Sequence, residues 1–154
     1  MTDLEQAQRA AVVAEARSWI GTPHIDMARV KGAGVDCAMM SAEVYFACGL
    51  IPQQEVEFYP GDWHLHRCKE RYMERVRRYA REVSAPLPGD LVLYRFGRAF
   101  AHGGIVIAWP LIVHAVKSLG VTEAEGDSPD LAYDRSGKPR ERTFFRLNQW
   151  SAPE

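Results

Sequence analysis

Residues 91–116, LVLYRFGRAFAHGGIVIAWPLIVHAV, contain three β-rich runs in close succession. These runs are Leu91 to Phe96, Gly103 to Ala108 and Leu111 to Val116, and Thr143 to Leu147 forms a fourth. β-Branched and aromatic residues dominate the runs, and Gly and Pro interrupt them, which is typical of strands joined by turns. We therefore expect an antiparallel sheet in the C-terminal half.

The N-terminal half shows helical periodicity instead. Thr2 and Glu5 have the spacing of a capping box, and Gly21-Thr22-Pro23 ends the first predicted helix. Its buried face is expected to contain Leu4, Ala7, Ala11, Val12 and Trp19. A second helix is predicted from Cys37 to Gly49. A third is predicted from the stripe Leu65, Cys68, Tyr72, Val76, Tyr79 and Val83. Helices followed by strands favour an α+β fold over alternating βαβ units.

Two segments lack a clear period. Residues 27–35, MARVKGAGV, contain two glycines, which suits a loop that approaches another part of the chain closely. Residues 123–142 are polar and rich in Gly and Pro, so we predict a long loop there.

Length and composition predict one globular domain over residues 1–154. The chain is 47% hydrophobic and 25% charged. Its 19 Lys and Arg nearly balance its 20 Asp and Glu, so it lacks the basic excess of a dedicated nucleic-acid-binding protein. The longest apolar run, residues 103–116, is too short to span a bilayer. We predict no nucleic-acid partner and no membrane association.

The first residues, MTDLEQAQRA, lack the basic and apolar regions of a secretory signal. We therefore expect synthesis in the cytoplasm without a signal peptide.

Three cysteines do not suggest a disulfide framework. Cys37 lies at a predicted helix start, where unpaired N–H groups and the helix dipole favour a thiolate. A free cysteine is otherwise often a small buried hydrophobic residue, and this interpretation suits Cys48 and Cys68 on their apolar stripes. Cys37 instead follows a glycine-rich loop and Asp36, so it is the candidate nucleophile.

A cysteine nucleophile needs a base, and His102 and His114 are the candidates. Because side chains alternate along a strand, the two histidines share a face only if their connection has an odd number of residues or contains a bulge. Pairing centred on Ala108 would place them directly opposite each other, with Cβ atoms about 4.5–5.5 Å apart. The second imidazole would then orient the first.

Five motifs occur in an order and spacing that resemble the NlpC/P60 cysteine peptidases of bacterial cell-wall turnover. They are Gly21-Thr22-Pro23, KGAGVDC at 31–37, PGDLV at 88–92, AHGGIVI at 101–107 and IVHA at 112–115. The resemblance covers residues 18 to about 116. The KGAGVDC loop and residues 62–72, which include DWHLHR, are most similar to the phage-tail and gene-transfer-agent type.

This resemblance implies a papain-like core with N-terminal helices packed on a C-terminal antiparallel sheet, and a helical insertion at about 53–84. It implies a thiol endopeptidase that hydrolyses peptidoglycan stem peptides, typically between γ-D-glutamate and a diamino acid, without a cofactor. Carried over by position, Cys37 is the nucleophile, His102 the base and His114 the orienting residue. A phage or gene-transfer-agent tail, with its tail proteins as partners, would deliver the enzyme to the wall.

Near the nucleophile the sequence departs from the family pattern. His24 replaces the usual tyrosine, and Ala38-Met39 replaces Ser-Gly or Leu-Gly. The candidate substrate contacts are therefore His24, Asp36 and Ala38. For Asp36, binding of a peptide amine and capping of the following helix carry equal weight.

Three alternatives remain open from the sequence. A tail component could keep this fold without enzymatic activity. A zinc-dependent hydrolase could use His64 and His66 with Cys68, but no fourth ligand is evident, so we predict no metal. Acyl transfer on the same thiol scaffold would share every motif. The arginines of the third helix favour a solvated face over a docking site for an acidic partner.

Overall fold

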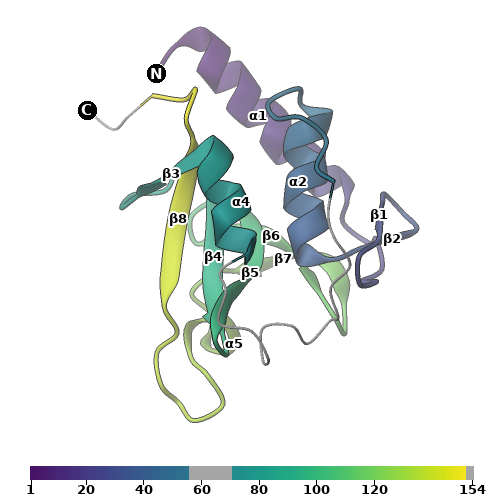
Figure 1. Cartoon of the computed structure of the whole chain (residues 1–154), viewed down its shortest axis with the longest axis vertical. Coiled ribbons are helices and arrows are strands. Elements are labelled where there is room, and N and C mark those ends of the chain that lie inside the picture. The colour runs from purple at the N-terminus through teal and green to yellow at the C-terminus, as the bar shows by residue number, and fades with distance from the viewer. Residues whose placement is uncertain (56–70, 152–154) are drawn as a thin grey trace.

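The computed structural model describes residues 1–55 and 71–151 (Figure 1). The elements are α1 (Asp3–Ser18), β1 (Arg29–Val30), β2 (Gly34–Val35), α2 (Cys37–Ala47), α4 (Arg71–Tyr79), β3 (Ala80–Val83), β4 (Leu91–Phe96), β5 (Ala99–Ala108), β6 (Leu111–Val116), β7 (Gly120–Glu125), α5 (Pro129–Ala132) and β8 (Arg142–Leu147). The main sheet has the order β3-β8-β4-β5-β6-β7, and all neighbouring strands are antiparallel. The predicted α+β class is confirmed.

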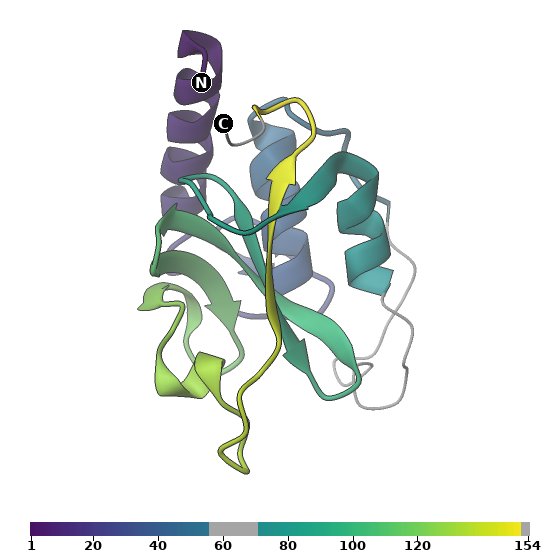
Figure 2. The ribbon, with the colours of Figure 1, turned by 90° about the vertical axis from the view of Figure 1, so that its left-hand side faces the viewer.

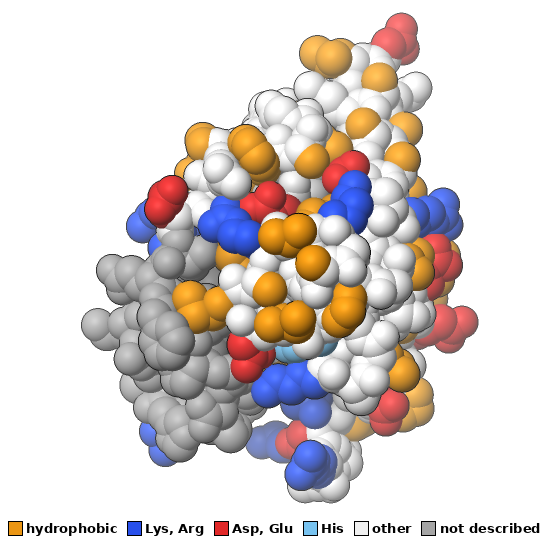
Figure 3. All heavy atoms as spheres, turned by 90° about the vertical axis from the view of Figure 1, so that its right-hand side faces the viewer, with side chains coloured by type: hydrophobic (Ala, Val, Ile, Leu, Met, Phe, Trp, Pro, Cys, Tyr) orange, Lys and Arg blue, Asp and Glu red, His pale blue; other side chains and the backbone are white. Residues whose placement is uncertain are grey.

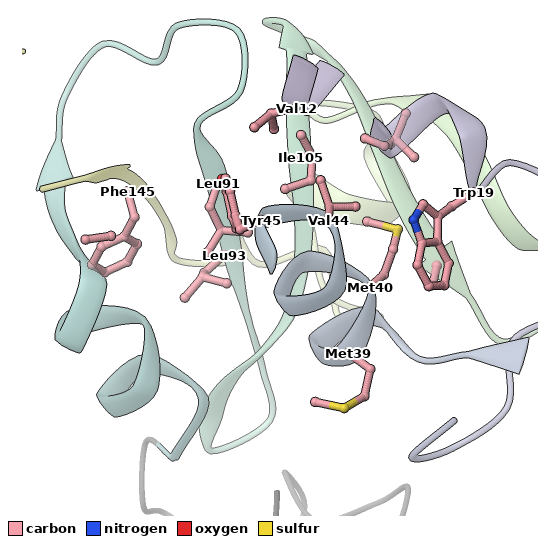
Figure 4. Close-up of a cluster of buried hydrophobic side chains, with 14 of the residues drawn as sticks. Val12, Trp19, Met39, Met40, Val44, Tyr45, Leu91, Leu93, Ile105 and Phe145 are labelled. Carbon is pink, nitrogen blue, oxygen red and sulfur yellow. The ribbon is translucent and has the colours of Figure 1, made fainter. Parts of the chain in front are cut away.

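Helices α1, α2 and α4 cover one face of the sheet, as Figures 1 and 2 show. Figure 4 shows the core between these layers, where Met40 and Val44 of α2 face Leu93 and Ile105 of the sheet. All four side chains are fully buried. Burial of each such side chain is worth roughly 1.5–3 kcal/mol, so this core fixes α2 against β4 and β5. The opposite face carries a smaller cluster around Tyr94 and Val106.

Helix α1 buries only part of the predicted face: Val12 and Trp19 are buried as predicted, but Ala11 is exposed. Leu4 is 68% exposed, and Ala7 is also exposed. Glu5 and Arg9 are buried in place of the exposed residues. The cap is as predicted, because the hydroxyl of Thr2 accepts a hydrogen bond from the Glu5 N–H. The predicted face followed the apolar stripe of the helix. The ion pair of Arg9 with Asp90 instead orients the helix so that Glu5 and Arg9 are buried.

The third predicted helix ends earlier than its stripe suggested. Helix α4 stops at Tyr79, and residues 80–83 form the edge strand β3, which pairs with β8. The predicted helical insertion at 53–84 is therefore wrong at its end; its middle, residues 56–70, lies outside the described residues. Val83 fits both a helical and a strand period, and the tertiary pairing decides between them.

Two segments predicted to be irregular contain short strands. Strand β7 extends to Glu125, three residues into the predicted loop, because residues 123–125 pair with β6; Glu123 and Glu125 are exposed on this edge strand. Strands β1 and β2 form a small antiparallel pair in the glycine-rich loop. A Cβ at Gly34 would lie 2.6 Å from Cδ1 of Ile25, which confirms the predicted close approach.

In the described part of the chain, none of the helices combines the length and apolar character needed to cross a membrane.

Candidate active site

Cys37 is the first residue of α2, as the sequence predicted. Asp36 caps this helix: its Oδ1 accepts a hydrogen bond from the Met39 N–H at 2.9 Å. Its Oδ2 accepts from the Met27 N–H at 2.8 Å, which ties the glycine-rich loop to the helix start. The capping role of Asp36 is confirmed, and binding of a substrate amine stays a prediction.

The thiol of Cys37 lies against the backbone of β5. Its Sγ donates to the carbonyl of Ala101 at 3.4 Å, and the N–H of Gly103 also faces the sulfur. The sulfur thus meets the backbone on either side of His102, and no hydrogen bond joins it to the His102 ring. The thiol reaches β5 from the face that the helices cover, whereas His102 lies beside Tyr94 and Phe96, which belong to the cluster on the opposite face. The structure therefore shows no contact between the Cys37 thiol and the His102 ring.

Burial, and next the negative charge of Asp36, raise the pKa of Cys37 from about 9 to about 12. From its place at a helix start, the thiol was expected to favour the thiolate. Backbone N–H groups do lower the pKa, but the loss of solvent outweighs them. The resting site therefore holds a protonated thiol.

His102 and His114 share one face of neighbouring antiparallel strands, as predicted. His102 Nε2 lies 2.8 Å from His114 Nδ1, a hydrogen-bonding distance. The register differs from the expected one, because Gly104 rather than His102 lies directly opposite His114. A bulge between Val106 and Ala108 shifts the pairing, and the histidines meet diagonally.

Two consecutive glycines permit these close approaches on both faces of β5. A Cβ at Gly104 would lie 3.2 Å from Cβ of His114, so the missing side chain leaves room for the diagonal contact. On the other face, a Cβ at Gly103 would lie 2.7 Å from the Tyr72 hydroxyl oxygen and 2.9 Å from Leu93 Cδ2. Glycine in a strand often marks such an approach, and this signal was present in the sequence.

The two imidazoles lie among aromatic rings. Phe96 stacks on His102 with ring centroids 5.2 Å apart and an angle of 20° between the planes. Burial lowers the pKa of both His102 and His114, and the positive charges of His114, His24 and Arg140 lower that of His102 further. Both rings are neutral at pH 7.

The predicted substrate contacts lie around this site. His24 forms a β-bridge with Val35 and is close enough for its charge to act on His102. Ala38, in the first turn of α2, lines a cavity of about 340 Å³ between α2, α4 and the sheet. Figure 3 shows a histidine side chain at the surface between hydrophobic and basic side chains.

Sequence reasoning missed two neighbours of the site. Tyr72 was assigned to an apolar stripe, but its hydroxyl lies beside Gly103. Phe96 was assigned only to a strand, yet it stacks on His102. The packing of α4 on the sheet places Tyr72 and the register of β4 places Phe96, and neither is evident from the residue type.

The possible zinc ligands His64, His66 and Cys68 lie outside the described residues. Within residues 1–55 and 71–151, no three His, Cys, Asp or Glu side chains form a group that could hold a metal ion.

Sequence comparisons with protein families and with curated proteins give no match. Solved structures do match. The NlpC/p60 domain of the peptidoglycan hydrolase SagA superposes with a TM-score of 0.56 at 18% identity, covering 88% of this chain and 96% of that domain. The peptidoglycan hydrolase RipB from Mycobacterium tuberculosis gives 0.58 at 16% identity, covering 97% and 70%. NlpC1 from Trichomonas vaginalis gives 0.62 at 11% identity, covering 91% and 43%.

The chain therefore has the fold of NlpC/P60 domains. It spans nearly all of the SagA domain but less than half of the Trichomonas vaginalis protein. At these identities the comparison establishes the fold, and function has to be argued from the site.

Proposed function

We propose that this protein is a thiol endopeptidase that hydrolyses peptidoglycan stem peptides, at the bond between γ-D-glutamate and a diamino acid. The observation that carries the proposal is the 2.8 Å contact between His102 and His114 on a strand whose backbone touches the Cys37 thiol. The fold is shared with domains described as peptidoglycan hydrolases. The class of bond is the one that the resemblance of the sequence motifs to NlpC/P60 peptidases implies.

The histidine contact supports different roles for the two rings in this proposal. His102 engages His114 through Nε2, which leaves Nδ1 of His102 to accept the thiol proton. For Nδ1 to be an acceptor, Nε2 must carry the hydrogen and donate it to Nδ1 of His114. His114 thereby fixes the tautomer and orientation of the base, as the third member of a catalytic triad does.

The proposed reaction requires the thiol to leave the Ala101 carbonyl and to meet Nδ1 of His102, with which it shares no hydrogen bond in the resting site, and to lose its proton there. Hydrogen bonds of this kind are often long in a substrate-free site and tighten when substrate binds. The thiolate of Cys37 attacks the peptide carbonyl carbon, and a C–S bond forms. The amine leaves with the proton from His102, and water then hydrolyses the thioester. His24 and Ala38 flank the acyl group.

We further propose that a phage or gene-transfer-agent tail carries the protein to the cell wall. This part of the proposal is supported by the KGAGVDC loop and by the similarity of residues 62–72 to tail proteins of that type. Tail proteins would be its partners.

A second candidate function is a structural tail component without activity. The raised pKa of Cys37 and the donation of its proton to Ala101 favour this candidate, because a protonated thiol is a poor nucleophile.

Digestion of purified peptidoglycan separates the two. We expect the wild-type protein and Cys48→Ala to release peptides, and Cys37→Ala to release none; mass spectrometry of the peptides identifies the bond. Absence of any release by the wild type would favour the structural role. Digestion in ¹⁸O-labelled water distinguishes hydrolysis, which places the label in the new carboxylate, from acyl transfer. Zinc analysis of protein purified without added metal tests the His64 and His66 alternative.

A further inference from the structure

Tyr72 on α4 holds a buried hydroxyl that lacks a hydrogen-bond partner among the residues that the structure describes. The residue is 9% exposed. A buried hydroxyl without a partner costs roughly 1–3 kcal/mol, so such a group in a site calls for an explanation.

The hydroxyl and the Cys37 sulfur meet at one residue, Gly103. The Gly103 N–H faces the sulfur, and a Cβ on Gly103 would lie 2.7 Å from the hydroxyl oxygen of Tyr72. Burial, and next the charge of Cys37, raise the pKa of Tyr72, which agrees with their proximity. The Ser41 hydroxyl lowers that pKa, yet no hydrogen bond of ordinary length joins Ser41 to Tyr72.

We propose that the Tyr72 hydroxyl donates a hydrogen bond to the Cys37 sulfur once the thiol has lost its proton. In the resting site the thiol is itself a donor to Ala101 and a weak acceptor, which leaves Tyr72 unpaired. After the proton moves to His102, the sulfur is an anion and accepts the phenolic hydrogen strongly. Tyr72 keeps its own proton throughout.

This donor offsets the groups that oppose the thiolate. The titratable groups around the thiol are Asp36 at the helix N-cap, Tyr72 on α4, and the His102 and His114 pair on β5 and β6. Asp36 is negative and opposes ionisation of the thiol, and the two neutral rings do not favour it in the resting state. Tyr72 adds a neutral donor that favours only the ionised sulfur.

The inference rests on the proposed role of Cys37, but its test requires no substrate. We would alkylate the folded protein with iodoacetamide from pH 6 to 11 and measure the rate at Cys37 by peptide mapping. In Tyr72→Phe we expect about tenfold slower alkylation at any pH below the midpoint, which corresponds to a midpoint raised by about one unit. Tyr79→Phe is the matched control, because Tyr79 lies on the same helix and its hydroxyl accepts from Gln54 instead.

The proposal and a purely structural role for Tyr72 predict different melting temperatures and different alkylation rates for Tyr72→Phe. Under the proposal, Tyr72→Phe should slow alkylation of Cys37. It should also keep or raise the melting temperature, because the hydroxyl is without a described partner in the resting fold. Equal alkylation profiles for Tyr72→Phe and wild type would overturn the proposal. If the wild type cleaves no peptidoglycan but the profiles differ as expected, the hydrogen bond stands and the proposed function fails.

Discussion

Two buried polar clusters in this protein are built in opposite ways. The first, which we call the Asp90 cluster, is charged and consists of Glu5, Arg9, Asp90 and Arg146. The second is the site, which is uncharged and consists of the protonated thiol of Cys37 and the neutral imidazoles of His102 and His114.

The Asp90 cluster joins α1, the start of β4 and β8 through short ion pairs. Arg9 Nη1 lies 2.9 Å from Asp90 Oδ1, and Arg146 Nη2 lies 2.8 Å from Asp90 Oδ2. The Leu87 N–H also donates to Asp90 at 2.8 Å. Each of these partners comes from a different segment, so the cluster fixes their relative positions.

The difference shows how burial can serve structure or chemistry. A buried carboxylate with two arginine partners is strongly held, because loss of any partner leaves an uncompensated charge. The uncharged site has fewer fixed contacts. The Cys37 thiol makes one hydrogen bond, to the Ala101 carbonyl at 3.4 Å, and the Tyr72 hydroxyl makes none with the described residues. Its groups can exchange partners when a proton moves.

The largest effect should come from Asp90→Asn. This change leaves Arg9 and Arg146 buried without a full counter-charge, so we expect a loss of about 3–5 kcal/mol in the free energy of unfolding. Urea denaturation measures it, with Asp130→Asn on the exposed surface as the control. A loss below about 1 kcal/mol would show that the Asp90 cluster does not hold the fold together.

The second prediction concerns unequal roles within the site. His102→Gln should reduce peptidoglycan cleavage by about 10²–10⁴-fold, because it removes the general base. His114→Gln should retain more activity, since it keeps a hydrogen-bonding group beside His102. Circular dichroism must show both variants folded, because His114 is buried in β6. If His114→Gln is the more damaged variant, the two roles are reversed.

Acidification should act on the two clusters in overlapping pH ranges that begin at different pH values. The pKa values of His102 and His114 are lowered in the folded state, so the unfolded chain takes up protons first and stability falls below about pH 6.5. Burial by itself raises the pKa of Glu5, but hydrogen bonds from Ser151 and Arg9 lower it from 4.5 to about 2. Its contribution is present above pH 4.5 and is lost as the pH falls toward 2.

We expect each step to be about 1–2 kcal/mol in urea denaturation series at pH 7, 5 and 3. Glu5→Gln should flatten only the lower step, whereas His114→Gln should flatten the upper step and part of the lower one, because the folded pKa of His114 is about 4. A change in the upper step in Glu5→Gln would mean that the clusters are coupled.

The smallest effect is expected at an exposed ion pair. Arg17 and Glu123 lie 2.8 Å apart, but their side chains are 47% and 37% exposed. Arg17→Gln should therefore change the free energy of unfolding by less than about 1 kcal/mol, again by urea denaturation. A loss as large as that of Asp90→Asn would refute the view that burial gives the Asp90 cluster its strength.

The sequence by itself determined the local elements of this protein and the types of residue at its site. Strand periodicity placed β4 and β6, and the capping pattern placed the start of α2 at Cys37. The alternation of side chains showed that His102 and His114 share a face only if their connection has an odd number of residues or contains a bulge. These features depend on neighbours in the chain, so they could be predicted.

Only the tertiary structure decided which contacts those residues make. The buried face of α1 depends on Asp90, which is 81 residues away from Arg9, and the end of α4 depends on pairing with β8. The charge state of Cys37 likewise depends on how deeply β5 and α2 pack, since burial outweighs the helix start. Desolvation and pairing between distant segments are properties of the assembled core, and periodicity carries no information about them.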